Sequence, residues 1–158
     1  MRQAAEMVAA AIRDAFKERS DFGCYVEDEH DVQLKVSRAL AGTGTFAIVT
    51  VADYARRANS GELLTGTITF DVTLFENVPA NRAKTGFMTA QGAAQRIAET
   101  LHWRRLGGRF ESPLRVSGVR RNPGDAKFAS VSVTVEAEYL LRQAAGDAAA
   151  PQDVAEHS

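Results

Sequence analysis

The stretch TGTITFDVTLFE, residues 65–76, decides the fold of this chain together with TAQGAAQRIAETLHW, residues 89–103. In the first stretch apolar and polar side chains alternate, which is typical of a strand with one buried face. The apolar row is Ile68, Phe70, Val72 and Leu74. Because Pro79 has no N–H to donate to a sheet, we expect this strand to end by Val78.

The second stretch predicts a helix, because its apolar residues recur at helical spacing and form one narrow stripe. The stripe consists of Ala90, Ala93, Ala94, Ile97, Ala98 and Leu101. Thr89 or Thr85 is a candidate N-cap, since a threonine hydroxyl can accept from a free backbone N–H. We expect Gly107 and Gly108 to end the helix, with Arg104 and Arg105 near its negative end.

The rest of the chain predicts a helix at 3–18, a short strand at 22–26, a strand at 45–52, and a hairpin of strands at 113–119 and 128–139. Residues 28–40 fit either a helix or a strand, and we favour the helix. These elements predict one α+β domain over residues 1–141. Its sheet is mainly antiparallel (mixed), with about four or five strands and two or three helices packed on one face. Residues 142–158 are low in complexity and predict a disordered tail.

The composition predicts a soluble protein. The chain has 158 residues and a net charge of −1, so its overall charge recruits neither nucleic acid nor an anionic membrane. No apolar run approaches the length of a membrane span, and we see no signal peptide. Cys24 is the only cysteine, so no internal disulfide can form, and a reducing compartment is expected.

Charged residues are unevenly distributed along the sequence. Basic residues gather at Arg104, Arg105, Arg109, Arg115, Arg120 and Arg121, and acidic ones at Glu27, Asp28, Glu29 and Asp31. We favour solvated loops and strand faces as the explanation, because surface charge runs are common and individually weak. The alternative is that opposite charges pair copies of the protein head to tail.

Residue types that carry catalysis or bind metals are too scattered to predict a site. His30, His102 and His157 have no second ligand at a suitable spacing, so we expect neither a metal nor a cofactor. Cys24 paired with a histidine could act as a nucleophile, but a small buried side chain is favoured. The strand aromatics are expected in the core rather than on an RNA-binding surface. They are Phe46, Phe70, Phe75, Phe128 and Tyr139. Trp103 is either core or a partner anchor.

Residues 70–101 resemble the tail terminator and minor tail proteins of long-tailed bacteriophages and prophages. The resemblance is carried by the alternating strand at 68–76, the connector Asn77–Arg82, the approach at 86–89 and the helix at 90–101. The first helix and the strand at 130–139 agree in order, so the similar layout covers most of residues 1–140.

The resemblance implies a hexameric ring that caps the growing tail tube and joins the tail to the head. It implies further copies of the chain, the tail tube protein and a head-completion or connector protein as partners. It also implies a place in the virion tail after assembly in the bacterial cytoplasm. Such proteins work through surfaces, so we expect no enzymatic activity, no membrane contact and no sequence-specific nucleic acid.

By position, the loop at 54–62 and the region at 104–121 are the candidate partner or subunit interface. The residues concerned are Tyr54, Arg56, Arg57, Arg104, Arg105, Arg109, Arg120 and Arg121. One alternative is a head–tail connector or a tail tube subunit, which the sequence separates poorly from a terminator. An alternative of another class is a small ligand-binding or enzymatic α+β domain, with Cys24, His102 or the acidic residues in a pocket.

Overall fold

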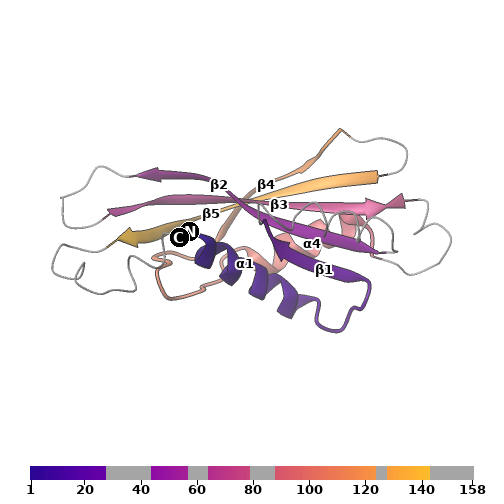
Figure 1. Ribbon diagram of the computed structural model, residues 1–158, viewed down its shortest axis with the longest axis horizontal. Coiled ribbons are helices and arrows are strands. Elements are labelled where there is room, and N and C mark those ends of the chain that lie inside the picture. Colours follow the sequence, from indigo (N-terminus) through magenta and orange to yellow (C-terminus); the bar gives the residue numbers. More distant parts are fainter. Residues whose placement is uncertain (28–43, 57–63, 79–87, 124–127, 143–158) are drawn as a thin grey trace.

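The computed structural model describes residues 1–27, 44–56, 64–78, 88–123 and 128–142, and these contain one five-stranded sheet (Figure 1). The strands are β1 (Phe22–Val26), β2 (Thr45–Arg56), β3 (Leu64–Asn77), β4 (Arg115–Arg121) and β5 (Phe128–Arg142). Their order across the sheet is β1-β2-β3-β5-β4. β1 runs parallel to β2, and every other neighbouring pair is antiparallel. The sheet is therefore mixed but mainly antiparallel, as predicted.

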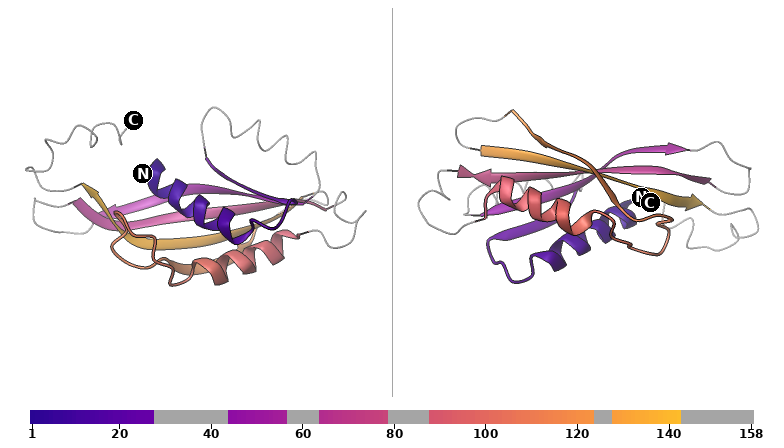
Figure 2. Two further views of the ribbon diagram at one scale, coloured as in Figure 1. Left: turned by 90° about the horizontal axis from the view of Figure 1, so that it is seen from below. Right: turned by 180° about the vertical axis from the view of Figure 1, so that it is seen from behind.

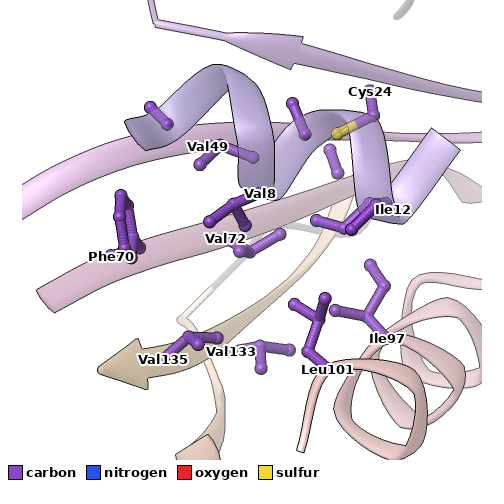
Figure 3. Packing of buried hydrophobic residues seen from close by; sticks show 14 of the residues in the cluster. Val8, Ile12, Cys24, Val49, Phe70, Val72, Ile97, Leu101, Val133 and Val135 are labelled. Atoms are coloured by element: carbon purple, nitrogen blue, oxygen red, sulfur yellow. The ribbon is translucent and has the colours of Figure 1, made fainter. Parts of the chain in front are cut away.

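The two helices of the described chain, α1 (Arg2–Ala15) and α4 (Ala90–Leu101), lie on the same face of the sheet (Figure 2). Their buried residues join one face of the sheet in a single apolar cluster. The close-up in Figure 3 shows Val8 and Ile12 of α1, with Ile97 and Leu101 of α4, around Val72 of β3. The predicted α+β class, with helices on one face, is confirmed.

β3 lies at the centre of the sheet and organises the core. Its predicted apolar row, Ile68 to Leu74, is fully buried. Because the side-chain period of a strand is two, the register with β5 places one row of that strand on the same core face. That row consists of Val131, Val133, Val135, Ala137 and Tyr139, and all five are buried, as the alternation predicts.

The opposite face of β3 and β5 is polar, and no helix of the described chain covers it. Thr67 donates to a carboxylate oxygen of Glu138 at 3.1 Å, and Thr134 donates to Asp71 at 3.3 Å. These cross-strand bonds satisfy side chains on a surface that is only half-exposed. Among the described residues, β3 and β5 therefore contribute apolar side chains to the face that the helices cover and mainly hydroxyl and acidic side chains to the other face.

β2 continues to Arg56, four residues beyond the predicted end at Ala52. It continues because it pairs with β3 as far as Arg56 opposite Gly66, with a shift of register between Val51 and Asp53. The backbones approach so closely there that a Cβ on Gly66 would lie 2.4 Å from the carbonyl oxygen of Ala55. Glycine is therefore required at position 66 for the two long strands to stay paired.

α1 ends at Ala15, although the sequence pattern predicts a helix to Glu18. The next N–H groups form tighter turns, from Phe16 to the carbonyl of Arg13 and from Lys17 to that of Asp14. The ring of Phe16 stacks on Phe22 of β1, with 3.9 Å between the ring centroids. Tertiary packing of this aromatic pair accompanies the early turn toward the sheet.

α4 ends at Leu101, not at Trp103, and the prediction that Gly107 and Gly108 end it is wrong. His102 is already extended, and Trp103 has a left-handed φ of 65°. The N–H of Trp103 donates to the carbonyl of Leu114 at 2.8 Å, and the N–H of Leu114 donates to the carbonyl of Arg104 at 2.8 Å. The helix therefore ends where the backbone of Trp103 and Arg104 forms hydrogen bonds with Leu114 instead of continuing the helical hydrogen bonds.

The last hairpin is shifted relative to its prediction. β4 covers Arg115–Arg121 instead of 113–119, and β5 extends three residues past Tyr139 because it pairs with the start of β3. Arg142, the first residue of the predicted tail, belongs to β5, and residues 143–158 lie outside the described chain. The ambiguous segment 28–40 also lies outside it.

Candidate functional site

The structure divides the arginine-rich region into engaged and exposed residues. Arg115 lies at the beginning of β4 and forms ion pairs with Glu136 at 3.5 Å and Glu138 at 3.4 Å on neighbouring β5. The guanidinium of Arg109 donates to the carbonyl of Leu141. Arg109 and Arg115 therefore stabilise the sheet and its adjoining loop, and both are half-buried.

The remaining arginines of this region fall into two places. Arg104 is half-buried and Arg105 is exposed just after α4, while Arg120 and Arg121 are exposed at the end of β4. Five residues of strand between Val116 and Arg121 span roughly 16 Å. The structure therefore does not bring the predicted arginines together in one patch.

Trp103 directly precedes Arg104 in the chain and is the most exposed large apolar side chain of the described residues, at 64%. Its ring meets His102 edge-on, with 5.2 Å between the ring centroids. The two bonds with Leu114 fix its backbone in the left-handed region, which is costly for a residue with a Cβ. The fold thus fixes the backbone at a residue whose large aromatic side chain is exposed to solvent. Trp103 is therefore not a core residue, and its role as a partner anchor stays a prediction.

His102 connects this turn to β4. Its Nδ1 accepts from the N–H of Val116 at 3.1 Å, so a neutral imidazole carries its proton on Nε2. This bond occupies a backbone donor at the outer side of β4, which is an edge strand of the sheet. Beyond it the edge is exposed from Ser117 to Arg121, and Val119 is 44% exposed. Sequence analysis named Arg120 and Arg121 as candidate interface residues but did not predict that their strand lies at an edge of the sheet.

Tyr54 and Arg56 lie on the far part of β2. The Tyr54 hydroxyl lies 3.1 Å from the carbonyl oxygen of Tyr139 and 3.3 Å from that of Leu64, so it ties β2 to the ends of β3 and β5. Arg56 is exposed. Arg57 and the rest of the predicted loop lie outside the described residues. The position of Tyr54 is that of a sheet residue rather than of a loop contact.

A polar cluster holds the beginning of α4, and sequence reasoning identified Thr89 as a candidate cap but missed Glu76 and Asp21. The carboxylate of Glu76, buried at the end of β3, accepts from the N–H of Ala90 at 2.8 Å. Thr89 is the N-cap and accepts from the N–H of Gly92 at 3.0 Å, as predicted, whereas Thr85 lies outside the described residues. Glu76 of β3 and the capping residue Thr89 therefore each accept from a backbone N–H that the first turn of a helix leaves without a partner.

The same cluster extends to the segment before β1. Asp21 accepts from the N–H of Met88 at 2.9 Å and from two guanidinium nitrogens of Arg19 at 2.7 and 2.8 Å. Hydrogen bonding from Arg19 is the main reason that the pKa of Asp21 is lowered, and burial opposes it. The Thr45 hydroxyl donates to the carbonyl of Met88 at 2.6 Å. These contacts are structural, because they position the approach to α4.

The thiol of Cys24 points into the apolar core (Figure 3), and burial raises its pKa to about 12. It is therefore a poor nucleophile at neutral pH, in line with its interpretation as a small buried side chain. Among the residues that the structure describes, no group of three His, Cys, Asp or Glu side chains is placed to hold a metal ion. His30, His157 and the acidic residues after Glu27 lie outside that part.

The strand aromatics do not form an exposed stacking surface. Phe70 and Tyr139 are buried in the core, as predicted. Phe46 is also buried, but it lies on the other face of the sheet, where its ring stacks on half-buried Phe75 with 5.2 Å between centroids. The side chain of Phe128 is not among the described ones.

No protein-family model matches the sequence, and no curated protein matches it either. None of the helices that the structure describes is long and apolar enough to cross a membrane.

Proposed function

We propose that this chain is a structural tail-assembly protein of a long-tailed bacteriophage or prophage, most specifically a tail terminator. In this role copies of the chain form a ring that caps the tail tube, and the ring joins the tail to the head-completion or connector protein. The work is done by surfaces, with no catalytic step and no cofactor. The protein is assembled in the bacterial cytoplasm and ends in the virion tail.

The observation that carries the proposal is the exposure of the Trp103 side chain on a backbone that hydrogen bonds with Leu114 hold in place. The left-handed backbone of Trp103 costs free energy of folding, and its exposed indole is not buried in the core to compensate. A preorganised aromatic side chain does, however, lose little conformational freedom on binding, and tryptophan is enriched among residues that dominate protein interfaces. Such a feature favours a protein that works by docking.

The layout supports the same proposal. The strand β3, the capped helix α4 and the final hairpin follow one another in the order on which the resemblance to tail terminators rests. The helices cover one face of the sheet, while in the described part of the chain the edge strand β4 is exposed from Ser117 to Arg121. The raised pKa of the buried Cys24 thiol counts against thiol chemistry.

The test is the absolute mass of the purified chain, measured by light scattering after gel filtration at several concentrations. A discrete hexamer would have a mass of about 103 kDa, six times the chain mass of 17.1 kDa. Electron microscopy of the same fraction should show single closed rings. Filaments would instead indicate a tail tube subunit, and a concentration-independent monomer that also fails to bind tail tubes would refute an assembly role.

A further inference from the structure

β4 is the outermost strand on one side of the sheet (Figure 1), and its backbone groups can be assigned to the two sides of the strand. The N–H of Asn122 donates to the carbonyl of Ser130 at 2.9 Å, so the backbone of Asn122 faces β5. Backbone groups in an antiparallel pair alternate between the partner strand and the other side. Arg120 therefore also faces β5, while the N–H and C=O groups of Val119 and Arg121 point away from the sheet.

We call Ser117–Arg121 the β4 edge segment, and its sequence is complementary to itself. All five residues are exposed, and Val119 at the centre is 44% exposed. Two small uncharged residues precede Val119, and two arginines follow it. If a second copy runs antiparallel with the two Val119 residues opposite each other, each arginine lies beside a small residue of the other copy. Size and charge therefore match across a two-fold axis at Val119.

The open stretch of the edge also selects this register. It ends at Val116, whose N–H donates to Nδ1 of His102 at 3.1 Å. With the axis at Val119, five residues of the second copy fill the open stretch and stop beside His102. With the axis one residue later, Arg120 would lie opposite Arg120 of the other copy, and like charges directly opposite each other on paired strands are destabilising.

Gly118 is a residue that contacts within one chain do not explain. Its φ is not left-handed, although the type of β-bulge that requires glycine has a left-handed φ. A Cβ at this position would meet no atom within 4 Å. A glycine inside a strand is destabilising and often marks a place where another backbone approaches closely. Paired about Val119, Gly118 lies opposite Arg120 of the second copy.

The missing side chain of Gly118 leaves the guanidinium of that arginine room to lie across β4 toward β5. On this face of the sheet β5 carries Glu136 and Glu138, and both form ion pairs with the single cation Arg115. Two carboxylates against one guanidinium make this part of the surface acidic. The second copy therefore brings a positive charge to a negative surface.

The other edge strand, β1, does not offer a comparable stretch. It has five residues, Phe22–Val26, and the carbonyl of its central residue, Cys24, accepts from Nε of Arg13 at 3.0 Å. An edge whose outward groups are covered by another element is protected from pairing. Among the strands that the structure describes, β4 is therefore the edge that an identical copy can best offer in return.

We propose that two copies of the chain pair through their β4 edge segments, antiparallel and about a two-fold axis at Val119. The two Val119 residues exchange N–H···O=C hydrogen bonds, and the two sheets continue into each other. This inference goes beyond the proposed function and does not depend on it. A two-fold contact uses the same surface on both copies and joins them in pairs, so a ring needs a further surface.

The first experiment is disulfide cross-linking of the full-length chain. Two residues that exchange both backbone hydrogen bonds have Cα atoms about 5.5 Å apart, which is within the range of a disulfide. The two copies of position 121 would lie about 14 Å apart along the strands, which is too far. Val119→Cys is therefore compared with Arg121→Cys, an exposed control on the same strand, and the natural Cys24 is buried.

Both variants are incubated at about 100 μM chain with oxidised glutathione, and circular dichroism establishes that they are folded. Covalent dimers are followed on non-reducing gels. We expect Val119→Cys to cross-link at least about tenfold faster than Arg121→Cys, because thiol–disulfide exchange depends on the approach of the two sulfur atoms. Equal rates would overturn the register, and no dimer from either variant would overturn the pairing.

The second experiment changes the charge opposite Arg120. Gly118→Glu and Gly118→Arg enter the same open space, so they test the contact without crowding the fold. Ala10→Glu and Ala10→Arg make the same changes at an exposed site of α1 and serve as controls. Association is measured by light scattering over a dilution series, at about 50 mM salt and at about 500 mM salt, where charge pairs are screened.

We expect Gly118→Glu to associate about fivefold more strongly than the parent chain and Gly118→Arg about fivefold more weakly, because the two-fold axis repeats the new pair twice. The two Ala10 variants should associate alike, and higher salt should reduce the difference at position 118. Equal association of the two Gly118 variants, or a difference no larger than that between the Ala10 variants, would refute the pairing even if the chain assembles through another surface.

Discussion

Replacement of Glu76 tests how the sheet holds α4. Its carboxylate is buried and accepts from the N–H of Ala90 at 2.8 Å, at the positive end of the helix. A hydrogen bond to a charged group contributes about 1.5–3 kcal/mol to stability. A favourable charge at a helix N-terminus adds about 0.3–1 kcal/mol. Glu76→Ala removes both contributions, so we expect the free energy of unfolding to fall by about 3 kcal/mol.

Glu76→Gln separates the two contributions, because the amide oxygen can still accept from Ala90 while the charge is lost. We expect this variant to lose only about 1 kcal/mol. Thr89→Ala removes the side-chain cap from a different donor, that of Gly92, and should also cost about 1 kcal/mol. Glu99→Ala, on the exposed side of the same helix, should change stability by less than about 0.5 kcal/mol.

The assay is urea unfolding followed by far-ultraviolet circular dichroism, with the same slope required of all variants so that midpoints can be compared. A loss below about 1 kcal/mol for Glu76→Ala would show that water or another group replaces the carboxylate. An equal loss for Glu76→Gln and Glu76→Ala would show that charge rather than the hydrogen bond is what matters. Either result would refute the reasoning above.

Three further predictions concern single residues. Trp103→Gly and Trp103→Ala lose the same ring contacts, but only glycine suits a φ of 65°, so the glycine variant should be more stable in urea by about 1 kcal/mol; equal stabilities would contradict the left-handed backbone. Because the pKa of Asp21 is lowered in the folded state, its contribution to stability is present above the ordinary value of 3.8 and is lost as pH falls through the folded value. Urea unfolding from neutral to acidic pH should therefore show a shallower acid decline for Asp21→Asn than for the parent chain, and identical slopes would count against the ion pair with Arg19. With its pKa at about 12, Cys24 should react with an alkylating reagent at pH 8 roughly a thousandfold more slowly in the folded chain than in urea; similar rates would mean that the thiol is accessible.

Elements with a strong local pattern could be predicted from the amino-acid sequence alone. Alternation in β3 and β5 predicted which residues are buried, because the side-chain period of a strand fixes the face once one face is apolar. The stripe of α4 followed from helical spacing, and hydroxyl chemistry limited its cap to Thr89 or Thr85, of which the structure shows Thr89. These patterns were sufficient for the α+β class with both helices on one face.

The ends of the elements and the exposure of the charged side chains depend on long-range contacts, which local sequence patterns do not reveal. The N–H of Trp103 donates to the carbonyl of Leu114 instead of to a carbonyl of the helix. Nothing in the sequence around position 103 predicts this bond to a residue eleven positions away. The sequence does not distinguish the arginines from one another. In the structure, however, Arg115 forms ion pairs with two glutamates of β5, whereas Arg121 is exposed on the edge strand β4. Burial of Glu76 beneath α4 likewise depends on the approach of a helix to a strand end. Long-range backbone pairing sets all three, and single-sequence patterns do not contain it.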